Sequence, residues 1–475
     1  MSDQQFSRRR FLGSMMAMAG SSAAPFALNL AAMGNAVAAD VSGYKALVCL
    51  FMVGGNDHYN TVLATDPTSW NEYQKLRYSV ETDSIALRAA GTSGGVLPIA
   101  PNTPQAGRSF ALHPQLGAMK TLFDSGRAAV VSNVGTLIQP TTLAQYKAHS
   151  VPLPSKLFSH NDQQSTWQSC KPEGATFGWG GRMGDLLSSG NANANFTCVS
   201  AAGNAVFVSG KWVRQYQVSA AGAVPIKNLS GALFGSSVNP LRAIVTGNSG
   251  NLLEQEHAGV LNRAISTQAV LSTAMVPAGS GGVPEPGNYV NPNNGVSMVN
   301  PLAKQLQTVA RIIAARGTLG LRRQVFYVTL PGCDTHDGQR SLQADNMAKL
   351  AHALAYWDSI MGSLMGVNMR NNVTLFTASD FGRTLVSNGD GTDHGWGSHH
   401  FVVGGAVKGK NIYGTFPTIG LGHGADVGYG ALLPSVSVEQ YGATLGAWFG
   451  LTPTELVDVF PNLVNYSIRN LGFMA

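Results

Sequence analysis

The sequence predicts an α/β fold: a mostly parallel sheet with helices on both faces, interrupted by a Gly/Asn/Ser-rich insertion. Two observations support this. The apolar runs 45–53 and 324–330 are continuous, not alternating, as in strands that are buried on both faces. Segments with apolar residues at helical spacing, 302–315 and 342–364, come between such runs. Alternating strands and helices are typical of parallel sheets with right-handed crossovers.

Residues 1–38 are expected to be a twin-arginine signal peptide. Ser7-Arg-Arg-Arg-Phe-Leu-Gly13 is followed by a weakly apolar run and by Ala36-Val-Ala38, a small-residue cleavage pattern. The apolar run is too short and too rich in Gly and Ser for a stable membrane span. We therefore expect export by the twin-arginine translocase to the periplasm or the outside. This route carries folded proteins, which is compatible with metal loading before export.

Composition narrows the function classes further. The chain has a net charge of +6, but no cluster of Lys and Arg follows the signal peptide, so the sequence predicts no nucleic-acid partner. Its four cysteines permit at most two disulfides in an oxidising compartment. Cys170 and Cys198 lie in polar, loop-like sequence and are the expected pair. Cys49 lies in a strand pattern and is expected to be a small buried hydrophobe.

We expect residues 39–475 to form a single domain. After the first strand, residues 113–123 show helical spacing and 128–132 form another apolar run. Residues 185–300 are low in charge and rich in Ala, Asn, Ser and Gly, with many prolines towards their end. This middle segment is interpreted as an insertion or cap on the main sheet.

Polar side chains follow three of the predicted strands. Asp57 follows the strand 45–53, Asp334 and His336 follow 324–330, and Asp380 directly follows 373–379. Parallel strands share one carboxyl edge, and ligands bind there in open α/β sheets. These groups are therefore expected to converge, although hundreds of residues separate them.

After Asp380 comes a glycine-rich stretch that adds one aspartate–histidine pair and one histidine–histidine pair. We expect this stretch to be a loop. Carboxylates and imidazoles together are the ligands that zinc, manganese or iron favours. We expect a site for divalent metal ions (Zn, Mn, Ca or Mg) in which four to six of eight candidates are ligands. The candidates are Asp57, Asp334, His336, Asp380, Asp393, His394, His399 and His400. The alternative for any one of them is a capping role at a helix or turn.

Ser159, next to His160, is the expected nucleophile, with Thr136 as the alternative. Two metal ions and an activated nucleophile would suit hydrolysis of phosphate or sulfate esters. The Ser159–His160 pair also permits a different hypothesis, a serine hydrolase without metal.

Several of these motifs resemble the exported family called domain of unknown function 1501 (DUF1501). They are Leu157-Phe-Ser-His-Asn-Asp-Gln-Gln164, Asp334-Thr-His336 with Gln339, Asp380-Phe-Gly-Arg-Thr384, Gly391-Thr-Asp-His-Gly395 and Gly404-Gly-Ala-Val-Lys-Gly409. The resemblance implies an alkaline-phosphatase-like fold and metal-dependent hydrolysis of phosphate or sulfate esters. It implies metal ligands at Asp57, Asp334/His336, Asp380 and His399 or His400. Phe381 stands where the superfamily places a histidine, which puts one metal site in doubt.

The sequence thus predicts an exported metal-dependent hydrolase of phosphate or sulfate esters. The alternative is a non-catalytic envelope protein of the same fold, with a binding or assembly role.

Overall fold

The computed structural model describes residues 41–79, 84–229, 239–247 and 250–475. Residues 41–475 form one compact unit. The expected signal peptide, residues 1–38, lies outside the described residues. None of the helices described is long and apolar enough to cross a membrane.

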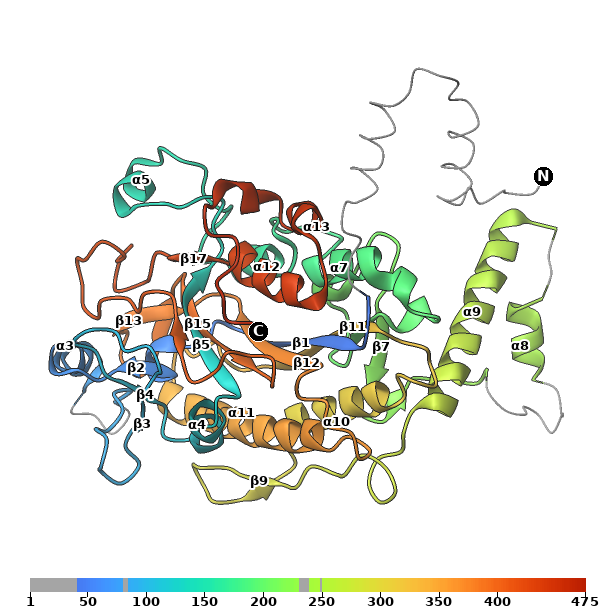
Figure 1. The fold of residues 1–475 in the computed structure, drawn as a ribbon, viewed down its shortest axis with the longest axis horizontal. Coiled ribbons are helices and arrows are strands. Elements are labelled where there is room, and N and C mark those ends of the chain that lie inside the picture. The colour runs from blue at the N-terminus through green and yellow to red at the C-terminus, as the bar shows by residue number, and fades with distance from the viewer. Residues whose placement is uncertain (1–40, 80–83, 230–238, 248–249) are drawn as a thin grey trace, which may run out of the picture. The chain divides into compact units, whose positions relative to one another are not determined.

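The centre of this unit is a sheet of ten strands within the described residues (Figure 1). Its order is β16-β5-β15-β12-β1-β11-β6-β7-β8, and β17 also pairs with β5. The strands are β1 (Lys45–Met52), β5 (Ala128–Gly135), β6 (Cys198–Ser200), β7 (Tyr216–Ser219), β8 (Gly222–Ala223), β11 (Arg323–Leu330), β12 (Val373–Ser379), β15 (Ser398–Val403), β16 (Ile412–Tyr413) and β17 (Val436–Ser437). β1 is parallel to both β11 and β12, whereas β15 is antiparallel to β12 and β5. The predicted mostly parallel sheet is confirmed.

Helices cover both faces of the sheet (Figure 1). On one face lie α4 (Gly117–Asp124), α10 (Pro301–Ala314) and α11 (Gln339–Gly362). On the other lie α6 (His160–Ser169), α7 (Trp179–Leu187), α12 (Val438–Phe449) and α13 (Pro453–Val459). The side chain of Asn300 caps α10, and Pro301 occupies its first turn, where no backbone donor is needed. The helix then buries the apolar stripe that the sequence predicts, including Leu306, Val309 and Ile313.

Part of the expected insertion, residues 185–300, extends the central sheet. β6 pairs in parallel with β11, and β7 pairs with β6. All three residues of β6 are buried, so its short apolar run belongs to the core. Beyond these strands come two helices, α8 (Pro240–Val245) and α9 (Leu252–Ala274), and the hairpin of β9 (Tyr289–Val290) and β10 (Ser297–Met298). Most of the α9 side chains are exposed.

Smaller elements surround the carboxyl ends of the strands. They are the 3-10 helix η1 (His58–Asn60), α3 (Pro67–Arg77), a small sheet of β2 (Val62–Ala64), β3 (Leu97–Ile99) and β4 (Phe110–Leu112), α5 (Leu143–Ala148), and a hairpin of β13 (Arg383–Ser387) and β14 (Thr392–His394). The hairpin occupies part of the stretch that the sequence predicts as a loop. Its register is irregular, so the strands shift relative to each other between Arg383 and Ser387.

The expected disulfide is wrong: all four cysteines are free. Cys198 lies in β6 against α7, where its sulfur is 3.9 Å from the carbonyl oxygen of Gly180. Cys170 follows the last residue of α6 and lies beside Glu439 of α12. The two thiols therefore face different helices. Cys49 is buried in β1, as the sequence predicts.

Candidate metal centre

Two of the predicted carboxylates lie at the ends of strands on either side of β1. Asp334 follows β11, and Asp380 directly follows β12. Gly54, just after β1, lets the backbone at Asp334 pack closely against the end of β1. A Cβ at position 54 would come within 2.4 Å of the backbone nitrogen of Asp334. Its φ of +110° also favours glycine. The Gly54 N–H donates to Oδ1 of Asp380 at 3.1 Å, which holds that carboxylate at the sheet edge.

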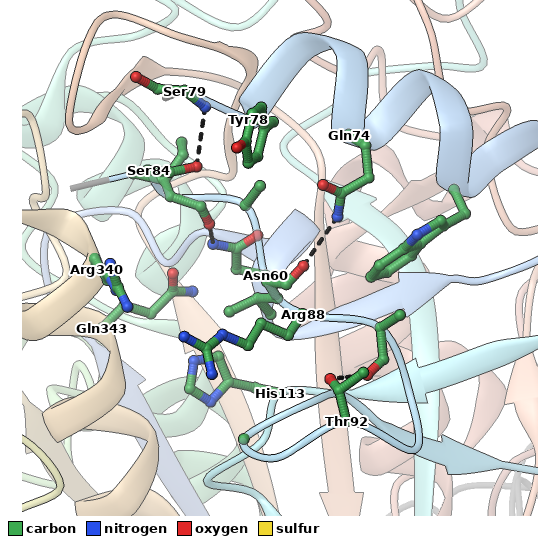
Figure 2. A pocket seen from close by; sticks show the side chains of 16 residues that line it. Asn60, Gln74, Tyr78, Ser79, Ser84, Arg88, Thr92, His113, Arg340 and Gln343 are labelled. Atoms are coloured by element: carbon green, nitrogen blue, oxygen red, sulfur yellow. Dashed lines mark hydrogen bonds between the residues drawn. The ribbon is translucent and has the colours of Figure 1, made fainter. Parts of the chain in front are cut away.

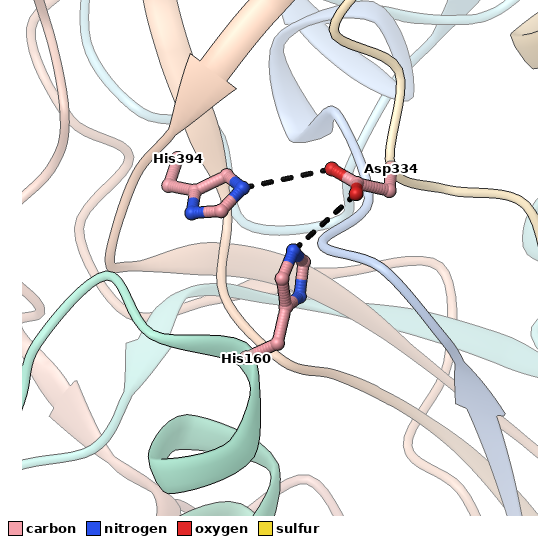
Figure 3. Close-up of side chains that lie close together, drawn as sticks. All are labelled: His160, Asp334 and His394. Carbon is pink, nitrogen blue, oxygen red and sulfur yellow. Dashed lines mark ion pairs between the residues drawn. The ribbon is translucent and has the colours of Figure 1, made fainter.

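His160, Asp334 and His394 form a cluster in which one ligand atom from each residue lies within 4.8 Å of the others (Figure 3). Nε2 of His160 is 3.4 Å from Oδ2 of Asp334, and Nε2 of His394 is 3.6 Å from Oδ1. His336 adds a third imidazole, with its Nε2 3.2 Å from Asp334 Oδ1 and 2.8 Å from His394 Nε2. The three Nε2 atoms thus gather around one carboxylate.

The opposite nitrogen of each imidazole, Nδ1, lies next to an acceptor. His160 Nδ1 is 2.7 Å from Asp380 Oδ2, and His394 Nδ1 is 2.7 Å from the carbonyl oxygen of Phe158. His336 Nδ1 is 3.2 Å from Oδ1 of Asp393. Acceptors at Nδ1 place the proton there and leave a lone pair on Nε2 of each neutral ring. This arrangement, in which the far nitrogen of each ligand is oriented by a carboxylate or carbonyl, is typical of metal-binding histidines.

The cluster is surrounded by groups that fix its charge and packing. Burial opposes ionisation of Asp334, but the Arg383 guanidinium, 2.5 Å away, lowers the pKa of this carboxyl. The hydrogen bond with Asp380 raises the pKa of His160, whereas burial lowers the pKa of His394. Phe381 is fully buried, and its ring centroid lies 4.8 Å from that of His160 and 4.6 Å from that of His394. Phe381 thus packs against two of the imidazoles.

Asp57 lies outside this cluster, although the sequence places it among the ligands. Arg77 of α3 binds both of its carboxylate oxygens, at 2.5 and 3.0 Å, and Gln339 donates to Oδ2 at 2.6 Å. Both charged side chains are almost completely buried. Asp57 also caps the short helix η1 through the N–H of Tyr59. The capping alternative therefore describes this residue.

The Asp57–Arg77 pair holds together the segments that carry the cluster. Arg77 also donates to the carbonyl oxygens of Thr384 and Leu385, directly after Arg383. Oε1 of Gln339 accepts from the hydroxyls of Thr335 and Thr392, which flank the cluster residues in sequence. The buried ion pair thus connects the end of β1 with the β13–β14 hairpin, and Gln339 links both to the segment after β11.

His399 and His400 are also separate from the cluster, because they lie in β15 and not on a loop. His399 is buried; its Nδ1 accepts from the backbone N–H of Asn133, and its ring packs against His58 and Phe416. His400 faces the other side of the strand, against Trp167 and Tyr441. Burial lowers the pKa of His400 to about 3 and that of His399 well below its ordinary range. Both are therefore neutral core residues.

Ser159 and His160 do not form a nucleophile–base pair. The hydroxyl of Ser159 donates to Asp162 at 3.3 Å, while His160 is held by Asp380. Thr136, the alternative nucleophile, is buried and donates to Gln163. Neither arrangement has the hydroxyl-to-imidazole hydrogen bond that a serine hydrolase needs.

Three further residues at the site, Gln164, Gln339 and Arg383, were not predicted from the sequence, although all three lie within the family-like motifs. Gln164 donates to Asp380 Oδ2 at 2.7 Å, beside His160. Gln339 and Arg383 contact Asp57 and Asp334. Their position three or four residues from a predicted site residue was a signal, but their partners are distant in sequence.

A separate cavity of about 1010 Å³ lies between α3, residues 84–94 and α11. Figure 2 shows Asn60, Gln74, Arg88, His113 and Gln343 at its walls. Gln74 and Asn60 donate to the carbonyl oxygens of Leu87 and Ile85, so these amides shape the wall. None of the cluster residues is among those described as lining it. The cavity and the histidine–aspartate cluster thus lie at different places in the fold.

Fold and site together define an α/β protein with a histidine–aspartate cluster at the carboxyl edge of a mostly parallel sheet. Residues 287–460 match the model of a family described as "Protein of unknown function (DUF1501)". The matched region contains Asp334, His336, Asp380 and His394; His160 and Asp57 lie before it. No curated protein matches the sequence.

Solved structures show distant likeness. Ps i-CgsB in complex with k-i-k-neocarrahexaose has a TM-score of 0.37 and 8% identity, with 89% of this chain and 76% of that chain covered. A Bacteroides thetaiotaomicron structure from work on the metabolism of multiple glycosaminoglycans has a TM-score of 0.29 and 9% identity, covering 78% and 69%. A mutant of alkaline phosphatase PafA has a TM-score of 0.27 and 10% identity, covering 72% and 64%. These scores are too low to transfer residue roles to this chain.

Proposed function

We propose that this chain is an exported, metal-dependent hydrolase that holds a divalent cation through His160, Asp334, His336 and His394. The observation that carries the proposal is the convergence of three imidazole Nε2 atoms on one carboxylate. Phosphate and sulfate esters are the proposed substrates, in keeping with the family-like motifs. Export through the twin-arginine route is proposed from the N-terminal sequence.

The chemistry of the cluster fits a cation. When Nδ1 carries the proton in both His336 and His394, two lone pairs face each other across 2.8 Å. Like lone pairs at this distance repel unless a proton or a metal ion lies between them. In addition, Nε2 of His160 is buried and makes no hydrogen bond among the described residues; the Oδ2 of Asp334 lies 3.4 Å from it. Buried polar atoms without a hydrogen bond are costly, so a ligand for this nitrogen is expected.

A divalent ion bound here would lower the pKa of a bound water and stabilise negative charge on an ester oxygen. Neighbouring groups of the chain hold and orient the side chains that would bind this ion. Asp380 fixes the ring of His160, and the Phe158 carbonyl fixes that of His394. Arg383 holds one oxygen of Asp334. The side chains of Asp334 and His336 are each 44% exposed, so the cluster is open to substrate.

The test is to purify residues 39–475, measure bound metal by elemental analysis, and assay aryl phosphates and aryl sulfates with and without added Zn²⁺ or Mn²⁺. We expect bound metal and metal-dependent release of the aryl alcohol. The double variant His160→Ala/His394→Ala should lose both. His257→Ala is the matched control, because His257 is exposed on α9. A folded protein that takes up no metal would contradict the proposal.

A second candidate is a non-catalytic envelope protein that keeps the metal site for binding. It is favoured by one observation: Asp57, which the resemblance places among the ligands of two metals, is neutralised by Arg77. The described residues then offer one cluster of this kind. Metal uptake without hydrolysis of any aryl ester would favour this candidate over the enzyme.

A further inference from the structure

A second, smaller cavity of about 240 Å³ lies between the end of α6 and the start of α12. Its lining is mixed. Leu137, Ile138, Leu153, Pro154 and Val438 form an apolar part, and Thr136, Ser155, Thr166 and Asn462 add polar groups. The one acidic side chain among the described lining residues is that of Glu439, in the first turn of α12. Apolar pockets with a few convergent polar groups are the usual form of small-molecule sites.

Glu439 has an unused acceptor although it is buried. The residue is only 3% exposed to solvent. Oε1 accepts from Nδ2 of Asn462 at 2.7 Å, but Oε2 has no hydrogen-bond partner among the described residues. Burial raises the pKa of this carboxyl to about 7, although the hydrogen bond from Asn462 and the charge of Arg182 act in the opposite direction. A buried carboxylate oxygen without a donor is destabilising, and a donor in the cavity would remove that cost.

Among the charged and titratable neighbours, the Cys170 thiol hydrogen-bonds to this carboxyl, but a thiol is a weak donor. Arg182, on α7, uses its guanidinium for the backbone carbonyls of Phe177, Ser169 and Val459. Burial raises the pKa of the Cys170 thiol well above its ordinary range and raises that of Tyr466, so both are neutral. Lys171 lines the cavity but is an exposed residue at its rim.

We propose that this cavity binds a small primary amine, with the ammonium group donating to Oε2 of Glu439 and the alkyl chain against the apolar part of the lining. The site is distinct from the metal cluster and goes beyond the proposed hydrolase activity. An ammonium group suits it better than a hydroxyl, because a hydrogen bond between opposite charges is roughly twice as strong as a neutral one.

The probe is n-butylammonium chloride, titrated by calorimetry into the metal-loaded protein (residues 39–475) at pH 8. We expect saturable binding, and at least tenfold weaker binding of n-butanol. Glu439→Gln should weaken n-butylammonium binding at least tenfold. Glu173→Gln, which removes an exposed carboxylate from the same part of the chain, is the matched control and should leave the affinity unchanged.

The pH dependence of the unaltered protein gives an independent test if Glu439→Gln folds poorly. Protonation of Glu439 removes the negative charge that the ammonium needs, so the affinity should fall about tenfold for each pH unit below 7. Equal binding of n-butanol, pH-independent binding, or no binding of n-butylammonium at pH 8 would each overturn the proposal. In the last case the cavity holds water only. None of these outcomes depends on hydrolysis of an ester.

Discussion

Nδ1 of His160 lies 2.7 Å from Oδ2 of Asp380, a residue 220 positions further along the chain. This contact joins the start of α6 to the end of β12 and directs the opposite nitrogen of the imidazole towards Asp334. Asp380 is fully buried, and both of its oxygens accept hydrogen bonds. It therefore acts on the proposed metal through His160 as a positioning residue.

The first prediction concerns this positioning. Asp380→Asn keeps the shape of the side chain but removes the charge that fixes the ring of His160. We expect the affinity for Zn²⁺ to fall about 10- to 100-fold, the usual effect of removing such a partner. Competition with a chromophoric chelator measures it. Asp124→Asn, at an exposed ion pair with Lys120, should leave the affinity unchanged. An unaltered affinity in folded Asp380→Asn would contradict the assigned role.

Metal removal should destabilise the protein. A ligand that binds only the folded state at a free concentration 100 times its Kd contributes about 2.7 kcal/mol. We expect chelation by EDTA to lower the thermal midpoint and readdition of Zn²⁺ to restore it, as measured by calorimetry. The variant His160→Ala/His394→Ala should show no such change, whereas His257→Ala should behave as the unaltered protein. A midpoint that is insensitive to EDTA in a metal-loaded sample would argue against the site.

Asp57 should matter for stability and not for direct metal binding. Asp57→Asn leaves the Arg77 guanidinium buried without its counter-charge, which typically costs about 3–5 kcal/mol. Urea unfolding should show this loss, while metal stoichiometry in the folded fraction stays the same. Stoichiometric loss of metal at unchanged stability would instead assign Asp57 to the ligands.

Glu439 should make stability depend on pH. Its pKa is raised from 4.5 to about 7 in the folded protein, so the folded state holds the proton more tightly than the unfolded state. The contribution to stability is fully present below pH 4.5 and is lost as the pH rises through 7. A shift of this size corresponds to about 3 kcal/mol.

Glu439→Gln should remove this dependence. Urea unfolding at pH 5 and pH 8 compares the two proteins, and the stability gap between these pH values should shrink in the variant. Glu173→Gln should keep the gap of the unaltered protein. A gap that persists in Glu439→Gln would mean that another group titrates.

The ends of the strands could be predicted because they are marked by residues that are adjacent in the sequence. A continuous apolar run marks each buried parallel strand, and the next polar residue marks its carboxyl edge, so Asp334 and Asp380 are correctly placed near one another. The positions of His399 and His400 were harder to predict from the sequence. Sequence shows two histidines after a glycine-rich stretch, but their burial in β15 depends on neighbouring strands that pair with it from elsewhere in the chain.

By itself the sequence determined the mostly parallel α/β class, the long helices, and the set of carboxylates and imidazoles from which a site could be built. Only the tertiary structure decided which of them meet. Asp57 and Asp334 both follow central strands. Asp57 pairs with Arg77 of α3 and lies outside the cluster, whereas Asp334 pairs with Arg383 and lies within it. The physical reason is electrostatic. The orientation of a carboxylate at a strand end depends on the positive side chain that packs against it, and that side chain need not be near in sequence.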